Sequence, residues 1–187
     1  MILTQSIIQI LSILTLISNI VLGLFFIYFI IVKLILGKSF SSTEPINAFF
    51  KKNALLFAFI IALVGTSGSL FYSEIAGYEP CKLCWFQRIF MYPLTILLGI
   101  ALIKNDFEIA DYVIPLSVIG GLISTYHYYI QRVAYSLSCG VDAVSCTTTY
   151  SFYYGYITIP IMALTAFVMI IVLTYICKEH SPNYEMI

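Results

Sequence analysis

The stretch CWFQRIFMYPLTILLGIALI, residues 84–103, contains a single charged side chain, that of Arg88. A helix of about 20 residues spans the roughly 30 Å of hydrocarbon in a bilayer. Continuous apolar runs favour such helices over the alternating strands of a membrane barrel. Four further stretches of this kind occur, at residues 7–36, 53–73, 112–131 and 156–177. The sequence therefore predicts an all-α, polytopic membrane protein with five transmembrane helices in the lipid bilayer.

The amino-acid composition favours the same class. Hydrophobic residues make up 61% of the 187 residues and charged residues 10%, against about 45–50% and about 25% in soluble domains. Lys and Arg number 9, as do Asp and Glu, so the net charge is zero. Because there is no basic excess, nothing indicates a nucleic-acid partner.

The first apolar stretch, residues 7–36, is expected to be a spanning helix rather than a cleavable signal peptide. No Lys or Arg precedes Lys33, so the positive region of a signal peptide is missing, and the run is also too long. Residues 37–52 form the most linker-like segment of the chain, with Pro45 and several Ser and Thr residues. This segment separates the first helix from the other four.

Positive residues predict how the helices are oriented. Two of the connecting segments, 74–83 and 132–155, carry only Lys82 and Arg132. The positive residues near the other helix ends are Lys33, Lys38, Lys51, Lys52, Lys104 and Lys178. Because cytoplasmic segments are enriched in Lys and Arg, we expect the N-terminus outside the cytoplasm and the C-terminus inside.

Four of the five cysteines form two pairs that are close in sequence: Cys81 with Cys84, and Cys139 with Cys146. The predicted orientation places both pairs outside the cytoplasm, where disulfides form and persist. The fifth, Cys177, lies at the inner end of the last helix, and we expect it to be a packing residue.

Cys81 and Cys84 are expected in the first turn of the third helix, with Pro80 at its start. The positive end of the helix dipole and a nearby cation favour a thiolate there. Arg88 lies one turn after Cys84 on the same face, and a membrane-embedded guanidinium needs a partner. The Cys84 thiolate and a quinone carbonyl oxygen are the candidate partners. A structural disulfide between Cys81 and Cys84 is less favoured, because its very small loop would add little stability.

A zinc site is the alternative for the four paired cysteines. The spacing of Cys139 and Cys146 exceeds the usual two to four residues between zinc ligands, so we expect no metal. Alone, this second pair could equally be a structural clip. With Cys81 and Cys84 on the same side of the membrane, a relay is favoured, in which one disulfide exchanges with a soluble partner and then with the other pair.

Two further polar residues lie at a predicted depth similar to that of Arg88. His127 could donate a hydrogen bond or a proton to a bound quinone, or it could be an interfacial residue of an aromatic belt. Gln87 could contact the same quinone, or it could form a hydrogen bond between helices.

The chain resembles the bacterial disulfide-bond formation protein B family, the quinone-linked oxidases of the periplasmic disulfide machinery. The resemblance covers roughly residues 54–177. Its motifs are Cys81-x-x-Cys84-Trp85-x-Gln87-Arg88, FMYPL at 90–94, Tyr126-His127-Tyr128 and GYITIP at 155–160. The close spacing of the second cysteine pair resembles the short members of Gram-positive bacteria. The resemblance implies a four-helix disulfide-oxidase core at 54–187, to which residues 1–53 add a helix and a cytoplasmic linker.

The resemblance also implies a thiol relay in the cytoplasmic (inner) membrane of a bacterium. A reduced thioredoxin-fold partner would attack the Cys139–Cys146 disulfide at Cys139, and Cys146 would then attack Cys81. Cys84 would be left as a thiolate facing the quinone, ubiquinone or menaquinone, with its charge steadied by Arg88. The alternative is a non-enzymatic, tetraspan-like membrane protein whose extracellular disulfides are structural.

Overall fold

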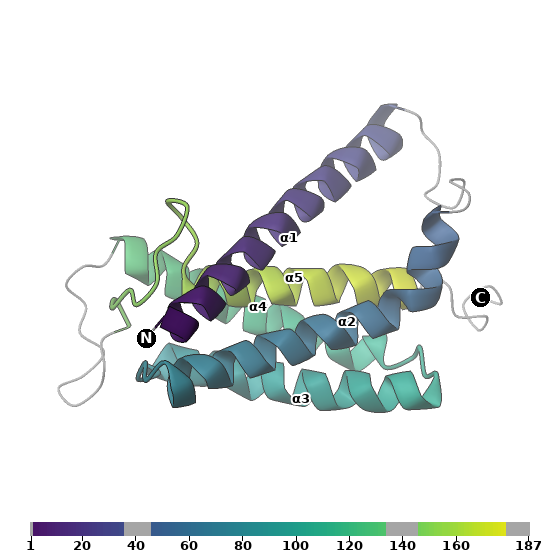
Figure 1. Cartoon of the computed structure of the whole chain (residues 1–187). Helices are drawn as coiled ribbons and strands as arrows, with labels where there is room; N and C mark the ends of the chain where they lie inside the picture. Colours follow the sequence, from purple (N-terminus) through teal and green to yellow (C-terminus); the bar gives the residue numbers. More distant parts are fainter. Residues whose placement is uncertain (1, 36–45, 134–145, 179–187) are drawn as a thin grey trace.

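The computed structural model of the chain describes residues 2–35, 46–133 and 146–178 (Figure 1). No β-strand occurs in these ranges, where only Tyr153 and Ile157 form an isolated bridge. Each of the five helices is long and apolar enough to cross a membrane. The helices are α1 (Ile2–Ile35), α2 (Ile46–Leu70), α3 (Lys82–Lys104), α4 (Ala110–Val133) and α5 (Ile159–Lys178). The predicted all-α, polytopic membrane fold is therefore confirmed.

Helices α2 to α5 form a four-helix bundle. Each packs against the next in the chain, and α5 packs back against α2. Short links at residues 76–81 and 105–109 make consecutive helices antiparallel. Side chains from α3 and α5 fill the centre, where Leu94, Leu98 and Phe167 are fully buried. Both cysteines of the CxxC motif lie at one end of this bundle, which we call the cysteine end.

The helix boundaries differ from the predicted ones by a few residues, and the difference matters at α3. The sequence placed both Cys81 and Cys84 in the first turn. In the structure α3 begins at Lys82, and Cys81 is its N-cap, with extended backbone angles of φ −70° and ψ 171°. The carbonyl of Cys81 accepts the first helical hydrogen bond, from Trp85, as an N-cap residue does. Only Cys84 therefore lies within the first turn.

Helix α1 crosses the bundle obliquely, so that only its first half packs against the other helices (Figure 1). It begins at the cysteine end and contacts mainly α5. Ile8, Ser12 and Thr15 are buried, and their spacing places them on one face of the helix. Further along, Leu24 and Ile27 are 63% and 55% exposed. The second half of α1 therefore leaves the bundle.

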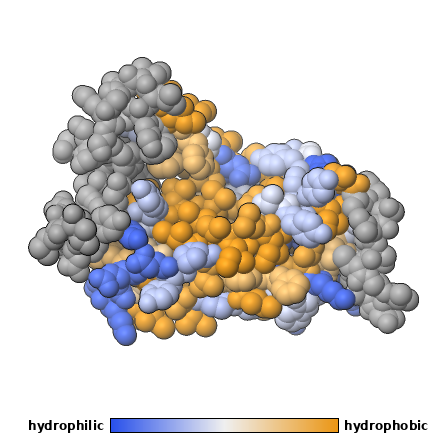
Figure 2. Space-filling view, turned by 180° about the vertical axis from the view of Figure 1, so that it is seen from behind, coloured by the Kyte–Doolittle hydropathy of each residue, from blue (hydrophilic) through white to orange (hydrophobic). Residues whose placement is uncertain are grey.

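The sides of the bundle expose large aliphatic residues, such as Ile89, Ile96 and Leu122. In the face shown in Figure 2, hydrophobic residues gather over the middle and strongly hydrophilic residues lie toward the ends. Large contiguous patches of exposed apolar side chains are rare on soluble monomers. The apolar sides of this bundle suit contact with lipid tails.

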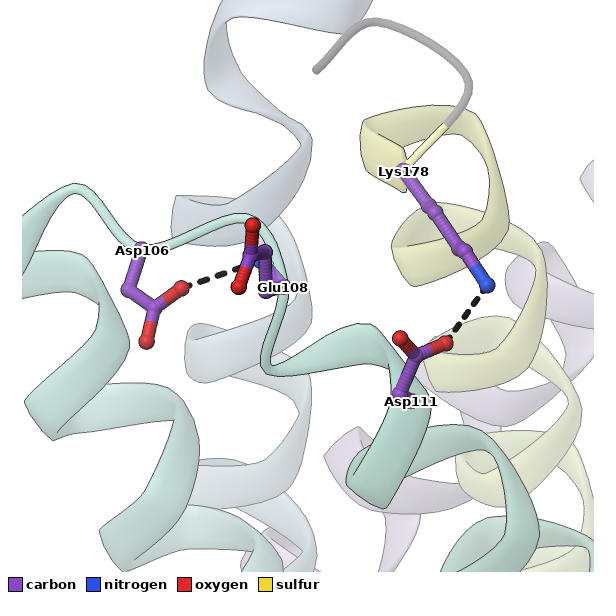
Figure 3. A network of polar contacts seen from close by, with 4 residues as sticks. All are labelled: Asp106, Glu108, Asp111 and Lys178. Atoms are coloured by element: carbon purple, nitrogen blue, oxygen red, sulfur yellow. Dashed lines mark hydrogen bonds and ion pairs between the residues drawn. The ribbon is translucent and has the colours of Figure 1, made fainter. Parts of the chain in front are cut away.

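The end of the bundle opposite the cysteines is polar. Asp111, in the first turn of α4, forms a salt bridge of 2.5 Å with Lys178, in the last turn of α5. Asp106 accepts a hydrogen bond of 3.0 Å from the backbone N–H of Glu108 (Figure 3). Asp111 and Lys178 complement the dipoles of their helices. Because both side chains are partly exposed, the pair stabilises the fold only slightly.

Gly120 of α4 lies directly against the fully buried ring of Phe167 in α5. A Cβ added at Gly120 would come within 2.4 Å of Cζ of Phe167, whereas a Cβ at Gly121 would meet no atom closer than 3.8 Å. We expect Gly120→Ala to lower the free energy of unfolding by about 1–3 kcal/mol through overpacking, and Gly121→Ala to leave it nearly unchanged. Thermal unfolding of both variants in detergent checks this, and equal loss in both would contradict the contact.

Candidate functional site

Cys81 and Cys84 lie side by side at the start of α3. The thiol of Cys81 donates a hydrogen bond to Sγ of Cys84 at 3.4 Å. This hydrogen bond, together with burial, raises the pKa of the Cys81 thiol to about 12, although the nearby His127 acts in the opposite direction. Cys81 is therefore the protonated partner in the reduced pair, and Cys84 is the sulfur that accepts the hydrogen bond.

His127 of α4 packs against the other side of Cys81. The ring is 1% exposed, its Nε2 lies 3.6 Å from Sγ of Cys81, and its Nδ1 lies 3.2 Å from Nε2 of Gln87. The amide nitrogen of Gln87 can only donate, so Nδ1 accepts from it and Nε2 is the ring nitrogen left to donate to Cys81. Gln87, His127, Cys81 and Cys84 therefore form one chain of hydrogen bonds that ends on the sulfur of Cys84.

The three side chains of Cys81, Cys84 and His127 have the donor types of a metal site. Their ligand atoms all lie within 4.8 Å of one another, whereas a structural zinc site needs a fourth ligand. The four-cysteine zinc site considered from the sequence would need Cys139, which lies outside the described residues. In the part of the chain that the structure describes, the third donor is His127.

A cavity of about 310 Å³ lies beside Cys84, at the lower end of the range of small-molecule sites. Cys84, Gln87, Arg88 and the acidic Glu79 line its polar end, near the cysteine end of the bundle. Tyr72, Tyr78 and Tyr150 line the cavity near this end as well, and the rest of the wall is largely aliphatic and comes from α1, α2, α3 and α5. His127 does not line this cavity. It lines a second, much smaller one of about 20 Å³ that also borders Cys81 and Cys84.

Arg88 is buried, with 9% of its surface exposed. Its Nε donates to Oγ of Ser69 at 3.0 Å, and its Nη2 donates to the backbone oxygen of Ser69 at 2.9 Å. Its Cζ lies 5.3 Å from the ring centre of Trp85. Within the described ranges no carboxylate is close enough for a salt bridge with Arg88. A buried guanidinium without a counter-ion suits a ligand group that is or becomes negative.

The sequence did not point to Ser69 as the residue that holds Arg88. It lies just after the small-residue stretch GTSG, residues 65–68, which predicts a close helix contact. That contact is present, because a Cβ at Gly65 would lie 3.4 Å from Sδ of Met91. The tight approach of α2 to α3 is what brings Ser69 within reach of Arg88.

Three tyrosine rings stack at the cysteine end. Tyr72, Tyr78 and Tyr150 follow one another, with ring centres 5.9 Å and 4.7 Å apart. The π-helical turn Phe71–Ile75 that ends α2 carries Tyr72. Partial burial and then the charge of Glu79 raise the pKa of Tyr150. The stack of Tyr150 on Tyr78 ties the segment before α5 to the link that leads into α3.

The second cysteine pair is only partly placed. Cys139 lies outside the described residues. Cys146 is fully buried and lies in the neighbourhood of Cys84. Cys177 is also buried, near the opposite end of α5. The structure therefore brings Cys146, Cys81 and Cys84 together, and leaves Cys177 far from them in the chain's helical bundle.

Comparison with known proteins assigns the bundle to a family. Residues 51–177 match the family model described as "Disulfide bond formation protein DsbB". "Probable disulfide formation protein C 1" of Bacillus anthracis is 47% identical over 130 residues, which cover 68% of this chain and 94% of that protein. "Disulfide bond formation protein C" of Bacillus subtilis is 42% identical over 137 residues, which cover 71% and 99%.

A more distant relative outside the genus Bacillus also matches. "Probable disulfide formation protein" of Metapseudomonas resinovorans is 36% identical over 132 residues, which cover 69% of this chain and 92% of that protein. No solved structure matches the chain significantly. The family match begins after α1 and contains all of α3, α4 and the cysteine end. The chain belongs to the DsbB family of disulfide bond formation proteins.

Proposed function

We propose that this protein is a membrane thiol oxidase that re-oxidises a thioredoxin-fold dithiol partner and passes the electrons through its two cysteine pairs to a membrane quinone. Its place in disulfide bond formation follows from the family. The observation that best supports the quinone step is the cavity of about 310 Å³ that is lined by both Cys84 and the buried Arg88, which forms no salt bridge within the described ranges.

The proposed relay balances in electrons and protons at each exchange. The partner dithiol reduces the Cys139–Cys146 disulfide and leaves as a disulfide. Cys139 and Cys146 then re-form their bond by reducing the Cys81–Cys84 disulfide. Cys81 and Cys84 finally re-form theirs and release two electrons and two protons. A quinone accepts the two electrons and the two protons, and it leaves as the quinol.

The contacts of Cys81 and Cys84 support different roles for the two sulfurs. Cys81 is the sulfur that Cys146 would attack, because Cys84 is the better leaving group. Cys84 lies in the first turn of α3, where the positive end of the helix dipole stabilises a thiolate, and the stabler thiolate leaves faster. His127 stands behind Cys81 at 3.6 Å. We propose that His127 acts on the quinone only through Cys81, by holding or moving a proton at that sulfur.

The residues around the larger cavity fit a quinone. A quinone ring needs hydrogen-bond donors for its carbonyl oxygens, which gain negative charge on reduction. Gln87 and Arg88 supply donors at the polar end, and the aliphatic part of the wall suits the ring edge and the tail. Nη1 of Arg88 makes no hydrogen bond within the described ranges, where Nε and Nη2 are held by Ser69.

We further propose that the cysteine end faces outward from the cytoplasmic membrane of a bacterium. Helix α1 begins at this end and α5 ends at the other, which agrees with an external N-terminus and an internal C-terminus. The excess of lysines near the opposite helix ends supports the same orientation. The division into residues 1–53 and a core at 54–187 stays a proposal as well.

The function is tested with the purified full-length protein, a reduced thioredoxin-fold partner that carries a CxxC motif, and short-chain benzoquinone and naphthoquinone analogues. Quinol formation is followed optically. We expect catalytic turnover that depends on all three components. If neither quinone is reduced, and one zinc ion per chain is found by elemental analysis, the cysteine cluster is a metal site and the proposal fails. Disulfides that resist the partner would instead indicate the tetraspan-like alternative.

A further inference from the structure

We propose that α1 forms an additional wall of the quinone cavity, which contacts the hydrocarbon tail of the quinone and is held in place by Asn19. This inference rests on the proposed function, because it concerns the same cavity. The family match begins at residue 51, so α1 (Ile2–Ile35) lies outside it. The wall would therefore distinguish the quinone site of this chain from one built by the four-helix bundle alone.

One face of α1 borders the cavity. Leu11, Leu14, Thr15 and Ser18 all line it, and their spacing of three and four residues places them on the same side of the helix. The side chain of Leu11 lies against Gly68 of α2, where an added Cβ would come within 3.6 Å of its Cδ1. Small residues allow helices to approach closely in membranes. Helix α1 packs on α5, and its Leu11 reaches α2. It therefore covers the part of the cavity that lies between these two helices.

Asn19 attaches this wall to the bundle. Its Oδ1 lies 2.8 Å from the hydroxyl of Thr165 in α5, which can donate to it. Its Nδ2 donates to the hydroxyl of Tyr156 at 3.3 Å. Nearer the start of α1, the hydroxyl of Tyr153 donates to Oε1 of Gln5 at 3.3 Å. In an apolar surrounding these polar contacts define how α1 is rotated, so the lining face stays turned toward the cavity.

The chemistry of the wall matches the tail rather than the ring. Cys84, Gln87, Arg88 and Glu79 line the cysteine end of the cavity. Of the two α1 hydroxyls on the wall, that of Thr15 donates to the backbone oxygen of Leu11 at 2.8 Å. Helix α1 adds the aliphatic Leu11 and Leu14 to the wall, to which α2 contributes Val64. Leu14 is 47% exposed, so the wall also borders the lipid. A quinone whose ring lies beside Cys84 would place the first part of its tail against α1.

Trp85 offers a direct measure of quinone binding that needs no electron transfer. It is the single tryptophan of the chain, and its ring lies 5.3 Å from Cζ of Arg88, which lines the cavity. The quenching of its fluorescence is titrated in the oxidised, full-length protein with benzoquinone and naphthoquinone analogues that retain the first part of the hydrocarbon tail. The variants are Leu11→Phe, which enlarges a lining residue, and Asn19→Leu, which removes both contacts of Asn19.

We expect each variant to raise the dissociation constant of the quinone about fivefold or more, since both disturb a packed contact. The matched control is Ile13→Phe, on the opposite, 43% exposed face of α1, which should bind as the wild type does. If quinone quenching is unchanged in a folded Leu11→Phe or Asn19→Leu variant, the proposal that α1 forms a wall of the cavity is wrong. It is also wrong if Ile13→Phe weakens quinone binding as much as those variants do. Absence of quenching and of quinol formation in the wild type would instead overturn the proposed function.

Discussion

Cys84→Ser should lower the rate of quinol formation by about a thousandfold or more, the scale seen when an enzyme loses its reacting nucleophile. A serine hydroxyl cannot form a disulfide, so the Cys81–Cys84 pair could neither be reduced nor re-formed. Cys84 is also the only cysteine that lines the larger cavity among the described residues, so no other described thiol can replace it there. The measurement is steady-state quinol formation with a reduced partner in excess.

The same variant separates the two halves of the relay. The Cys139–Cys146 disulfide does not depend on Cys84 in the proposed scheme, so Cys84→Ser should still oxidise one equivalent of partner in a single turnover. Stopped-flow or acid-quench assays measure that burst. The matched control is Cys177→Ala, which removes a buried thiol far along α5 and should keep full turnover. Sustained quinol formation by Cys84→Ser would show that electrons reach the quinone by another route.

The membrane fold could be read from the sequence because the hydrophobic effect acts on composition and run length. Stretches such as residues 84–103 need no tertiary information to be assigned to lipid, and all five predicted helices are present. The sequence predicted that α3 starts at Pro80, whereas the helix begins at Lys82. Pro80 is compatible with either start, and only the extended backbone of Cys81 decides between them.

The direction of a polar side chain within the bundle was harder to foresee. The depth of His127 follows from its place in α4, but its direction depends on how α4 is rotated against its neighbours. That rotation is governed by contacts such as Gly120 against Phe167. The result turns His127 toward Cys81 and Gln87 and away from the larger cavity.

The contribution of α1 was not foreseen, although the sequence contains a signal for it. Ser12, Thr15 and Asn19 form a stripe of small and polar residues in an otherwise apolar helix, which is typical of a helix–helix contact in membranes. The stripe does not say which helix it meets. The partner of Asn19 is Thr165, which lies 146 residues away in the chain, and such a long-range pair follows from the fold alone.

Arg88→Gln should weaken the apparent affinity for the quinone about 10- to 100-fold and leave the apparent affinity for the thiol partner nearly unchanged. Hydrogen bonds to a charged group contribute about 1.5–3 kcal/mol, and a neutral amide also loses the attraction to the charge that develops on the quinone oxygen. Glutamine can still bond to Ser69, so the link between α2 and α3 is partly kept. The measurement is the Michaelis constant for each substrate, together with the quenching of Trp85 fluorescence.

Arg132→Gln is the matched control, because it removes the other arginine at the cysteine end. Arg132 donates to the carbonyl of Gly155 at 2.8 Å and packs over the ring of Phe152 at 4.9 Å, but it does not line the larger cavity. If quinone binding depends only on positive charge at the cysteine end, both variants should weaken it. If it depends on a direct contact with Arg88, only Arg88→Gln should weaken it. If Arg88→Gln instead lowers the affinities for quinone and partner equally, Arg88 serves the fold through Ser69 and does not hold the quinone.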